Sequence, residues 1–266
     1  MTPKVVVDIG NTRIKWGKVA RTGHSLEKVD ALPPHPDDWE KTLATADWKD
    51  TEGDDHSCWV VASVQPKRAD ALCAWLTERG QKVSRLEKAA QIPLRVALEH
   101  PDRAGIDRLL NAVAARKHLA EGQEAVLVDA GSAITIDWLD GKHVFRGGSI
   151  LPGLDLMAEA LHRYTALLPR VEVRELVTQL PGTSTTSAIQ TGLYLSVVGA
   201  IREAVSHYAA RAEKSLRIFL TGGQSPAIAK AMGLSDPVKR EPPWENCLLW
   251  PEQTLMGILM SVEGLA

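Results

Sequence analysis

Two stretches of this chain repeat one pattern, and this repetition constrains the possible fold more than any other feature. Residues 5–12 read VVVDIGNT, and residues 126–133 read VLVDAGSA. In both stretches, three apolar residues predict a buried strand, and a turn that contains Asp and Gly follows it. The two aspartates lie 129 − 8 = 121 positions apart. A period of that length indicates a duplicated domain, because solenoid repeats are much shorter.

An alternating segment follows each of these turns. After the first turn, Ile14 and Trp16 alternate with Arg13 and Lys15, and residues 134–138 behave similarly after the second. Each turn and the strands on either side of it therefore predict a hairpin. Taken alone, such a segment is best interpreted as an ordinary hairpin with a solvated turn. At its mouth, however, a carboxylate, hydroxyls and backbone N–H groups could hold a polyphosphate and its metal. Two similar α/β lobes meeting face to face would place both turns on opposite walls of one cleft.

Composition limits the classes of partner. The chain has 266 residues and a net charge of −2. A charge near zero argues against a broad basic surface that binds nucleic acid. We find no apolar run of membrane-spanning length and no signal-peptide pattern, so we expect a cytoplasmic protein without a membrane partner. Three cysteines, Cys58, Cys73 and Cys247, are widely spaced without a metal-binding pattern, and we expect reduced thiols.

Periodicity and turn residues predict the remaining elements. We expect loops around one short helix (38–45) within residues 21–57, and irregular chain over 168–181. A rise in polarity at residues 121–123 predicts the boundary between an N-terminal lobe (1–120) and a C-terminal lobe (121–266). The expected further strands are 58–64, 82–86, 143–145, 216–220 and 247–250, and the expected further helices begin near residues 66, 106, 154, 188, 226 and 253.

Asp107 follows a loop punctuated by Pro101 and Gly105 and lies at the start of a predicted helix. Asp is common there as an N-cap, and the local pattern favours that role. The alternative is a general base, a carboxylate at the end of a rigid element that accepts a hydroxyl proton. The local sequence leaves both interpretations open.

Two glycine-rich segments are predicted loops, residues 146–153 before a helix and residues 221–223 after a strand. Such loops either bring the backbone close to a ligand or make a tight connection. The two commonest nucleotide motifs, GxxxxGK[ST] and GxGxxG after a strand, are absent from the sequence. Two Asp-x-Gly turns, a third Asp and a double glycine fit phosphoryl transfer, which needs positioning, charge neutralisation and a base.

The motifs together resemble the type III pantothenate kinases and the related Bvg accessory factor proteins. The resemblance rests on DIGNT (8–12), SVxP (63–66), GIDR (105–108), DAGSAIT (129–135), GGSILPG (147–153) and TGG (221–223). It implies an α/β fold of two duplicated ribonuclease H-like lobes, of the acetate and sugar kinase/Hsp70/actin type. It also implies a homodimer that uses ATP to phosphorylate pantothenate to 4′-phosphopantothenate, the first step of coenzyme A biosynthesis, with Mg²⁺ and a monovalent cation, K⁺ or NH₄⁺.

The resemblance also implies roles for individual residues. Asp107 would be the catalytic base, Asp8 would lie close to magnesium, and Asp129 would bind the monovalent cation. The implied ATP-binding residues are Asp8, Ile9, Gly10, Asn11, Thr12, Arg13, Ile14, Lys15, Ser132, Gly222 and Gly223. The implied pantothenate-binding residues are Leu98, Gly105, Ile106, Asp107, Arg108 and Thr185. For Lys15, a solvated strand lysine is the alternative interpretation.

Three positions depart from the family pattern. Ser132 replaces a more usual Thr and keeps the hydroxyl, Leu98 stands where the family often has a Tyr, and Ser196 replaces a helix glycine. Two alternative functions stay open: a kinase-like accessory or regulatory factor without turnover, and a nucleotide or polyphosphate phosphohydrolase of the same fold.

Overall fold

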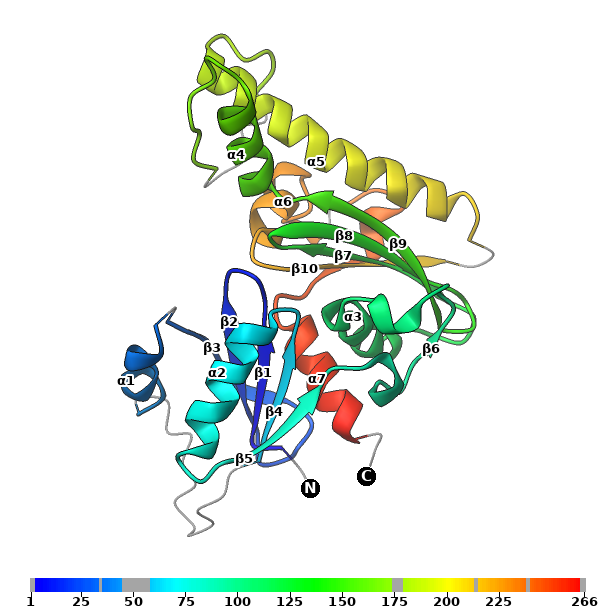
Figure 1. Cartoon of the computed structure of the whole chain (residues 1–266). Helices are drawn as coiled ribbons and strands as arrows, with labels where there is room; N and C mark the ends of the chain where they lie inside the picture. Colours follow the sequence, from blue (N-terminus) through cyan, green and yellow to red (C-terminus); the bar gives the residue numbers. More distant parts are fainter. Residues whose placement is uncertain are drawn as a thin grey trace. The chain divides into compact units, whose positions relative to one another are not determined.

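The computed structural model describes residues 3–33, 35–44, 58–173, 179–212, 215–237 and 240–263. The chain divides into two compact units (Figure 1). Unit 1 contains residues 1–118 and 252–266, and unit 2 contains residues 119–251. The predicted boundary at 120/121 lies two residues from the first crossing between units. The last residues of the chain, however, belong with the N-terminal part and not with the C-terminal lobe as predicted.

Unit 1 is built on a sheet with the strand order β3-β2-β1-β4-β5. The pairs β1–β2 and β2–β3 are antiparallel, whereas β1–β4 and β4–β5 are parallel. The central strand β1 is buried because its apolar residues are covered by neighbours on both sides of the sheet. The strands are β1 (Val5–Ile9), β2 (Ile14–Val19), β3 (Leu26–Leu32), β4 (Cys58–Ser63) and β5 (Lys82–Leu86).

The helices of unit 1 begin and end near the predicted positions. Pro66 occupies the first turn of α2, where its missing N–H costs nothing. Residues 45–57, which include part of the predicted helix 38–45, lie outside the described residues. The elements are η1 (Pro36–Asp38), α1 (Trp39–Ala44), α2 (Pro66–Thr77), η2 (Ala89–Gln91), the short strand β6 (Arg95–Val96), η3 (Pro101–Arg103), α3 (Ile106–Arg116) and α7 (Gln253–Glu263).

The C-terminal helix α7 packs on α3 and β1, which explains its place in unit 1. Gln253 Nε2 donates to the backbone oxygen of Asn111 at 2.9 Å, and Thr254 Oγ1 donates to Asn111 Oδ1 at 2.9 Å. All of these groups are buried, so these hydrogen bonds replace the hydrogen bonds to water that the groups lose on burial. The sequence predicts an amphipathic helix here correctly, but its pattern does not say which sheet the apolar face covers.

Unit 2 is built on a second sheet, whose strands from this unit have the order β11-β10-β7-β8-β9. The long helix α5 covers one face of it (Figure 1), and the core lies between them. Val126, Val128, Ile134 and Ile136 from the sheet are buried in one cluster with Ile201 and other residues of α5. The elements are β7 (Glu124–Ala130), β8 (Ala133–Leu139), β9 (Val144–Pro152), α4 (Leu154–Tyr164), α5 (Thr185–Ala209), β10 (Leu216–Thr221), α6 (Ser225–Ala231), η5 (Trp244–Asn246) and β11 (Cys247–Leu249).

The two units repeat one topology. Strands β7 and β8 pair antiparallel like β1 and β2, and β7 pairs parallel with β10 as β1 does with β4. Strand by strand, the order β9-β8-β7-β10-β11 corresponds to β3-β2-β1-β4-β5. The predicted duplication is therefore confirmed, and both Asp-x-Gly turns occupy the same place in their sheets.

Strand β3 corrects the prediction that residues 21–57 contain loops and one helix. Its inner residues are exposed, and Glu27 forms an ion pair with Lys18 of β2 at 2.9 Å. A solvated edge strand is held by backbone hydrogen bonds to its neighbour and needs no apolar alternation. The periodicity of the sequence therefore gives no signal for it.

Strand β9 corrects the predicted glycine-rich loop at residues 146–153, because the strand continues to Pro152. Gly147 has φ +85° at an irregularity in the pairing with β8. A Cβ at Gly148 would lie 1.9 Å from the backbone oxygen of Ile136, so only glycine allows this close approach of the two strands. The glycines thus serve strand pairing. The helix predicted after them, Leu154–Tyr164, has the predicted bounds.

Helix α5 also differs from the prediction in one respect. Its N-terminus is capped as the run of hydroxyls indicates, because the side chains of Ser184 and Ser187 form a capping box. The apolar residues that recur at helical spacing between residues 188 and 205 predict a largely buried helix that includes Leu195. Leu195 is nevertheless 52% exposed, and Ala188 is exposed as well. Helix α5 therefore has more apolar residues than unit 2 buries.

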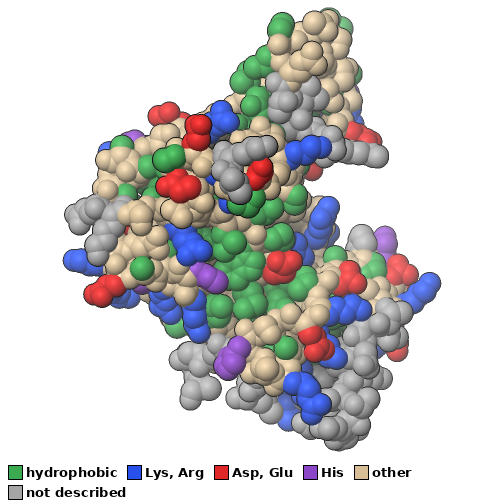
Figure 2. Space-filling model, turned by 180° about the vertical axis from the view of Figure 1, so that it is seen from behind, with side chains coloured by type: hydrophobic (Ala, Val, Ile, Leu, Met, Phe, Trp, Pro, Cys, Tyr) green, Lys and Arg blue, Asp and Glu red, His purple; other side chains and the backbone are tan. Residues whose placement is uncertain are grey.

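Charges of both signs lie interspersed on the face drawn in Figure 2, in agreement with the small net charge. None of the helices in the described part of the chain has the length and apolarity of a membrane span.

We predict a pH-dependent loss of stability when Asp140 is replaced by Asn. Burial alone would raise the Asp140 pKa, but hydrogen bonds from the N–H groups of Val144 and Lys142 and from Arg146 outweigh burial and hold the pKa below its usual range. Such a carboxylate stabilises the fold above the pKa of the unfolded chain, about 4, and this contribution is lost as the pH falls through the lowered folded pKa.

At pH 7, Asp140→Asn should lower the free energy of unfolding by about 1–3 kcal/mol. The difference from wild type should shrink below about pH 4. Urea unfolding at several pH values measures both effects, with the exposed Glu203→Gln as a control. A pH-independent difference would show that the charge of Asp140 is not involved.

Candidate functional site

Three chain segments of unit 2 meet at the carboxyl end of β7. The N–H of Gly153, at the start of α4, donates to the backbone oxygen of Ser132 at 3.0 Å. The N–H of Gln224, between β10 and α6, donates to the backbone oxygen of Ala130 at 2.9 Å. The turn between β7 and β8, which contains Ser132, is therefore hydrogen-bonded to the two other connections. Gly222, in the connection between β10 and α6, lies beside Asp129.

Gly222 makes this arrangement possible. Its φ is +92°, and a Cβ there would lie 2.5 Å from the backbone oxygen of Ala130 and 2.5 Å from Asp129 Oδ1. The Asp129 carboxylate thus lies directly against the backbone of the double glycine. A side chain at position 222 would displace the carboxylate and would also strain the backbone.

Thr221 brings a second oxygen to the same face of the sheet as Asp129. The two residues pair directly in the parallel register of β10 and β7, so their side chains point to one face. Thr221 is 2% exposed, and its hydroxyl makes no hydrogen bond to the residues that the structure describes. A carboxylate beside an unsatisfied hydroxyl is a donor set of hard oxygens, which alkali and alkaline-earth cations prefer.

The N-terminus of α4 adjoins this turn through the Gly153–Ser132 hydrogen bond. Its N-cap is Gly153, which offers no capping side chain. The N–H groups in the first turn of any helix lack intrahelical acceptors and carry partial positive charge. This end of unit 2 therefore combines oxygen atoms suited to a cation with N–H donors suited to an anion such as phosphate.

Unit 1 contains the matching arrangement around Asp8. The N–H of Gly10 donates to the backbone oxygen of Arg13 at 2.9 Å, which closes the turn between β1 and β2. The N–H of Val64 donates to the backbone oxygen of Ile9 at 3.1 Å, as that of Gln224 does to Ala130 in unit 2. Ser63 Oγ also donates to Ile9 at 3.3 Å. The SVxP motif therefore supports the first turn from the neighbouring strand.

The predicted ATP-binding residues of the first turn differ in exposure. Asn11, Thr12 and Arg13 are exposed, whereas Ile9 and Ile14 lie in the core of unit 1. The two isoleucines can contact a ligand only through their backbone. Lys15 of β2 lies directly opposite Asp8 of β1 in the antiparallel register of the two strands.

Asp107 lies in the first turn of α3 but is not the N-cap, which is Gly105. The Asp107 Oδ1 atom accepts a hydrogen bond from the N–H of Arg108 at 2.8 Å. A Cβ at Gly105 would lie 2.5 Å from the same oxygen, so glycine leaves room for the carboxylate to fold back over the helix start. The simple N-cap interpretation is therefore wrong, and the half-buried carboxylate is held in one orientation at a helix end.

The predicted substrate-binding residues come from both units. Leu98 is half-buried in the segment before η3, and Gly105, Asp107 and Arg108 follow it in unit 1, where Ile106 is buried. Thr185 is the exposed first residue of α5 in unit 2.

Besides the Thr221 hydroxyl, two residues at the site were not predicted from the sequence. Gln224 links two segments through its backbone, and its side-chain Nε2 donates to Asp155 Oδ2 of α4 at 3.3 Å. Its position directly after the double glycine was the available signal. Asp155 gave none, because an acidic residue in the first turn of a helix is ordinary.

Comparisons of the sequence with known proteins point to one family. The sequence model of a family described as type III pantothenate kinase matches residues 4–207. A type III pantothenate kinase from Persephonella marina is 30% identical over 85% of this chain and 89% of its own length.

Solved structures support the fold. A chain from Campylobacter jejuni assigned to the Baf family of transcriptional activators has a TM-score of 0.60 at 18% identity, covering 98% of each chain. A 2-dehydro-3-deoxygalactonokinase-like protein from Sinorhizobium meliloti has a TM-score of 0.56 at 12% identity, also covering 98% of each chain. The fold is the duplicated two-lobe fold of the acetate and sugar kinases, Hsp70 and actin.

Proposed function

The chain belongs to the type III pantothenate kinase family, and we propose that it transfers the γ-phosphoryl group of ATP to pantothenate, the first step of coenzyme A biosynthesis. The observation that carries this proposal is the pair of Asp-x-Gly turns at equivalent ends of two sheets of one topology. Phosphoryl transfer is mostly positioning and charge neutralisation, and these turns offer carboxylates, hydroxyls and backbone N–H groups for both tasks.

The proposed ATP contacts come from both turns. Residues 8–15 of unit 1 and Ser132, Gly222 and Gly223 of unit 2 would hold the phosphates. The exposed side chains of Asn11, Thr12 and Arg13 and the first-turn N–H groups of α4 support this assignment.

Asp107 is the proposed general base, and Leu98, Gly105, Ile106, Arg108 and Thr185 are the proposed pantothenate contacts. A free Asp has a pKa of about 3.9, too low to remove an alcohol proton in advance. Proton transfer to Asp107 therefore comes late, after much of the bond to phosphorus has changed. The Arg108 N–H fixes one carboxylate oxygen and so sets the orientation of the other.

Cations are part of the proposal. Asp8 would hold Mg²⁺ bound to the ATP phosphates, and Asp129 would hold a monovalent cation, K⁺ or NH₄⁺. The unsatisfied buried hydroxyl of Thr221 beside Asp129 fits such an ion, since a cation would supply the missing partner. When bound, these ions offset the negative charge of the transferring phosphoryl group.

We predict that Thr221→Val separates stability from potassium dependence. Without potassium, the free energy of unfolding should stay equal or rise by about 1 kcal/mol, because the substitution removes a buried hydroxyl that lacks a partner. The stabilisation that KCl gives over choline chloride in thermal unfolding should fall, and the potassium concentration for half-maximal turnover should rise about tenfold.

Asp129→Asn provides the comparison, with a larger loss of both potassium effects. If Thr221→Val responded to KCl like the wild type, the hydroxyl would not contact the cation.

A homodimer is the proposed oligomeric state. Leu156 on α4 and Leu195 on α5 are each 52% exposed, and nothing within 4 Å would meet a Cβ added at Gly192 or Gly199. An exposed leucine on each of two helices, with small residues beside the one on α5, suits contact with a second copy. In sedimentation experiments we expect a dimer for the wild type and a shift toward monomer for Leu195→Glu. A monomeric wild type at micromolar concentration would contradict this assignment.

The test of function is a coupled assay of ADP formation with and without pantothenate and potassium. ADP formation that needs pantothenate supports the kinase. Phosphate release without an acceptor would favour the phosphohydrolase, and a folded protein without any turnover would favour the accessory factor. We place the kinase in the cytoplasm, where ATP is made, and the free thiols Cys58, Cys73 and Cys247 agree with a reducing compartment.

A further inference from the structure

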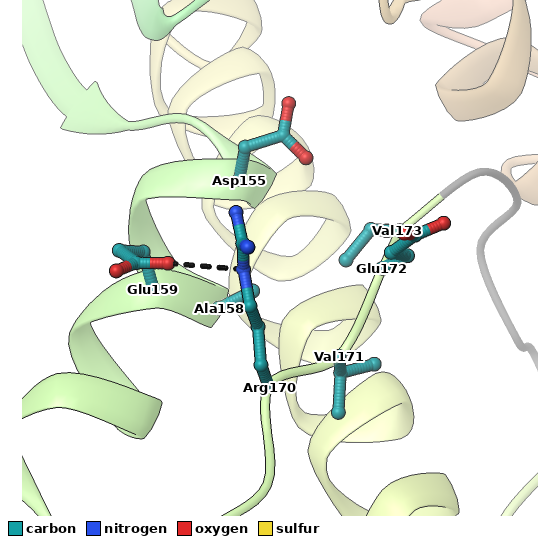
Figure 3. Close-up of a pocket in the computed structure, with 7 residues that line it drawn as sticks. All are labelled: Asp155, Ala158, Glu159, Arg170, Val171, Glu172 and Val173. Atoms are coloured by element: carbon teal, nitrogen blue, oxygen red, sulfur yellow. Dashed lines mark ion pairs between the residues drawn. The ribbon is translucent and has the colours of Figure 1, made fainter.

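A hollow of about 280 Å³ lies beside α4 in unit 2 (Figure 3). Its lining residues come from two segments, the first two turns of α4 and the chain at residues 170–173. Ala158 and Val171 are buried and form an apolar base, whereas the charged residues are exposed at the mouth. The charged lining residues are Asp155, Glu159, Arg170 and Glu172.

Hydrogen bonds connect this hollow to the turn that carries Asp129. Gln224 Nε2 donates to Asp155 Oδ2 at 3.3 Å, and the backbone N–H of Gln224 donates to the oxygen of Ala130 at 2.9 Å. Gln224 Oε1 is buried and accepts no hydrogen bond from the residues that the structure describes. An unsatisfied acceptor therefore lies beside Asp155, between the hollow and the double glycine.

The charge of the hollow limits what it can bind. Three carboxylates face one guanidinium, and Arg170 is already paired with Glu159 at 3.3 Å. Such a mouth repels phosphate groups, whereas carboxylates accept hydrogen bonds well from hydroxyls, as acidic residues do from ribose in dinucleotide sites. The apolar base suits a flat ring, and Arg170 extends along α4 toward Asp155 (Figure 3), where a guanidinium can stack on a base.

The size of the hollow agrees with a nucleoside. Pockets for drug-sized ligands measure about 300–1,000 Å³, so this one lies just below that range. A nucleoside fits such a volume but a complete nucleoside triphosphate does not, and the phosphates would extend toward the double glycine.

We propose that this hollow binds the nucleoside end of the phosphoryl donor, with Asp155 accepting a hydrogen bond from a ribose hydroxyl and the base resting on Ala158 and Val171. The inference rests on the proposed use of ATP and names the part of unit 2 that selects it. Gln224 then couples the occupied hollow to the turn that holds the phosphates. The enzyme should therefore distinguish a ribonucleotide from a deoxyribonucleotide and from a bare polyphosphate.

The test is calorimetric binding of ADP, 2′-deoxy-ADP and pyrophosphate, each with MgCl₂ and KCl, because binding does not depend on turnover. The wild type should bind ADP about tenfold more tightly than 2′-deoxy-ADP, since one charge-assisted hydrogen bond is lost. Asp155→Asn should weaken ADP binding about tenfold, reduce the preference over 2′-deoxy-ADP and leave pyrophosphate binding unchanged. Glu203→Gln, on the exposed side of α5, is the matched control.

A second variant, Ala158→Leu, fills the base of the hollow and should weaken ADP more than pyrophosphate, with thermal unfolding as the check on folding. Equal ADP affinity in Asp155→Asn and the wild type would overturn the inference, even if pantothenate is phosphorylated. So would equal affinity of the wild type for ADP and pyrophosphate. The predicted binding pattern without turnover of pantothenate would instead support the nucleoside site and overturn the proposed function.

Discussion

Replacing Asp107 by Asn should lower the turnover of pantothenate by about 100-fold or more while leaving nucleotide binding nearly unchanged. The amide keeps the oxygen that accepts the Arg108 N–H at 2.8 Å, so the first turn of α3 stays intact. It cannot accept the hydroxyl proton, and loss of a general base costs about 10²–10⁴-fold. Steady-state kinetics should show a fall in kcat with little change in the KM for ATP.

Asp102→Asn is the matched control, because Asp102 is an exposed carboxylate of η3 in the same segment of unit 1. It should retain turnover within about twofold of the wild type, as expected for a surface change outside the reacting groups. Near-wild-type turnover of Asp107→Asn would remove Asp107 from the proposed role.

The second large effect is expected from Gly222→Ala. The added Cβ would lie 2.5 Å from both the backbone oxygen of Ala130 and Asp129 Oδ1, in a backbone conformation with φ +92°. Left-handed strain costs about 1–2 kcal/mol and overpacking about 1–3 kcal/mol. We expect the free energy of unfolding to fall by about 2–5 kcal/mol and the activity to be lost, because the Asp129 carboxylate is displaced.

Gly233→Ala separates these two causes. Gly233 also has a left-handed φ, +77°, but nothing lies within 4 Å of its added Cβ. It should therefore show only the strain, about 1–2 kcal/mol in urea unfolding, and retain its kinetic constants. If Gly222→Ala lost no more stability than Gly233→Ala and kept its activity, the contact between the double glycine and Asp129 would not be needed for activity.

The sequence predicted those parts of the fold in which local pattern and burial agree. The strands on either side of each Asp-x-Gly turn are buried or alternate, and their hairpins are as predicted. Strand β3 was not predicted, because its exposed residues leave no periodic signal. Strand β9 was predicted only over residues 143–145, because the glycines that follow are typical of a loop. The return of α7 to unit 1 depends on buried contacts with Asn111, which involve residues more than 140 positions apart.

Residues of the candidate site could be predicted from the sequence where they belong to a short motif with a recognisable spacing. Asp8, Asp129 and Gly222 could be named because each belongs to a repeated or glycine-marked turn. The hydroxyl of Thr221 could not, because its lack of a partner is a property of the packed sheet. The link from Gln224 to Asp155 joins segments 69 positions apart and likewise appears only in the folded chain.

The central claim is that this chain moves a phosphoryl group from ATP to pantothenate, and following the oxygen atoms of that group tests it most directly. With ATP carrying ¹⁸O in the non-bridging positions of the γ-phosphate, mass spectrometry should find 4′-phosphopantothenate with all three labelled oxygens. Its formation should depend on potassium and be lost in Asp107→Asn. Labelled inorganic phosphate with unmodified pantothenate, or unconsumed ATP from a fully folded protein, would contradict the claim.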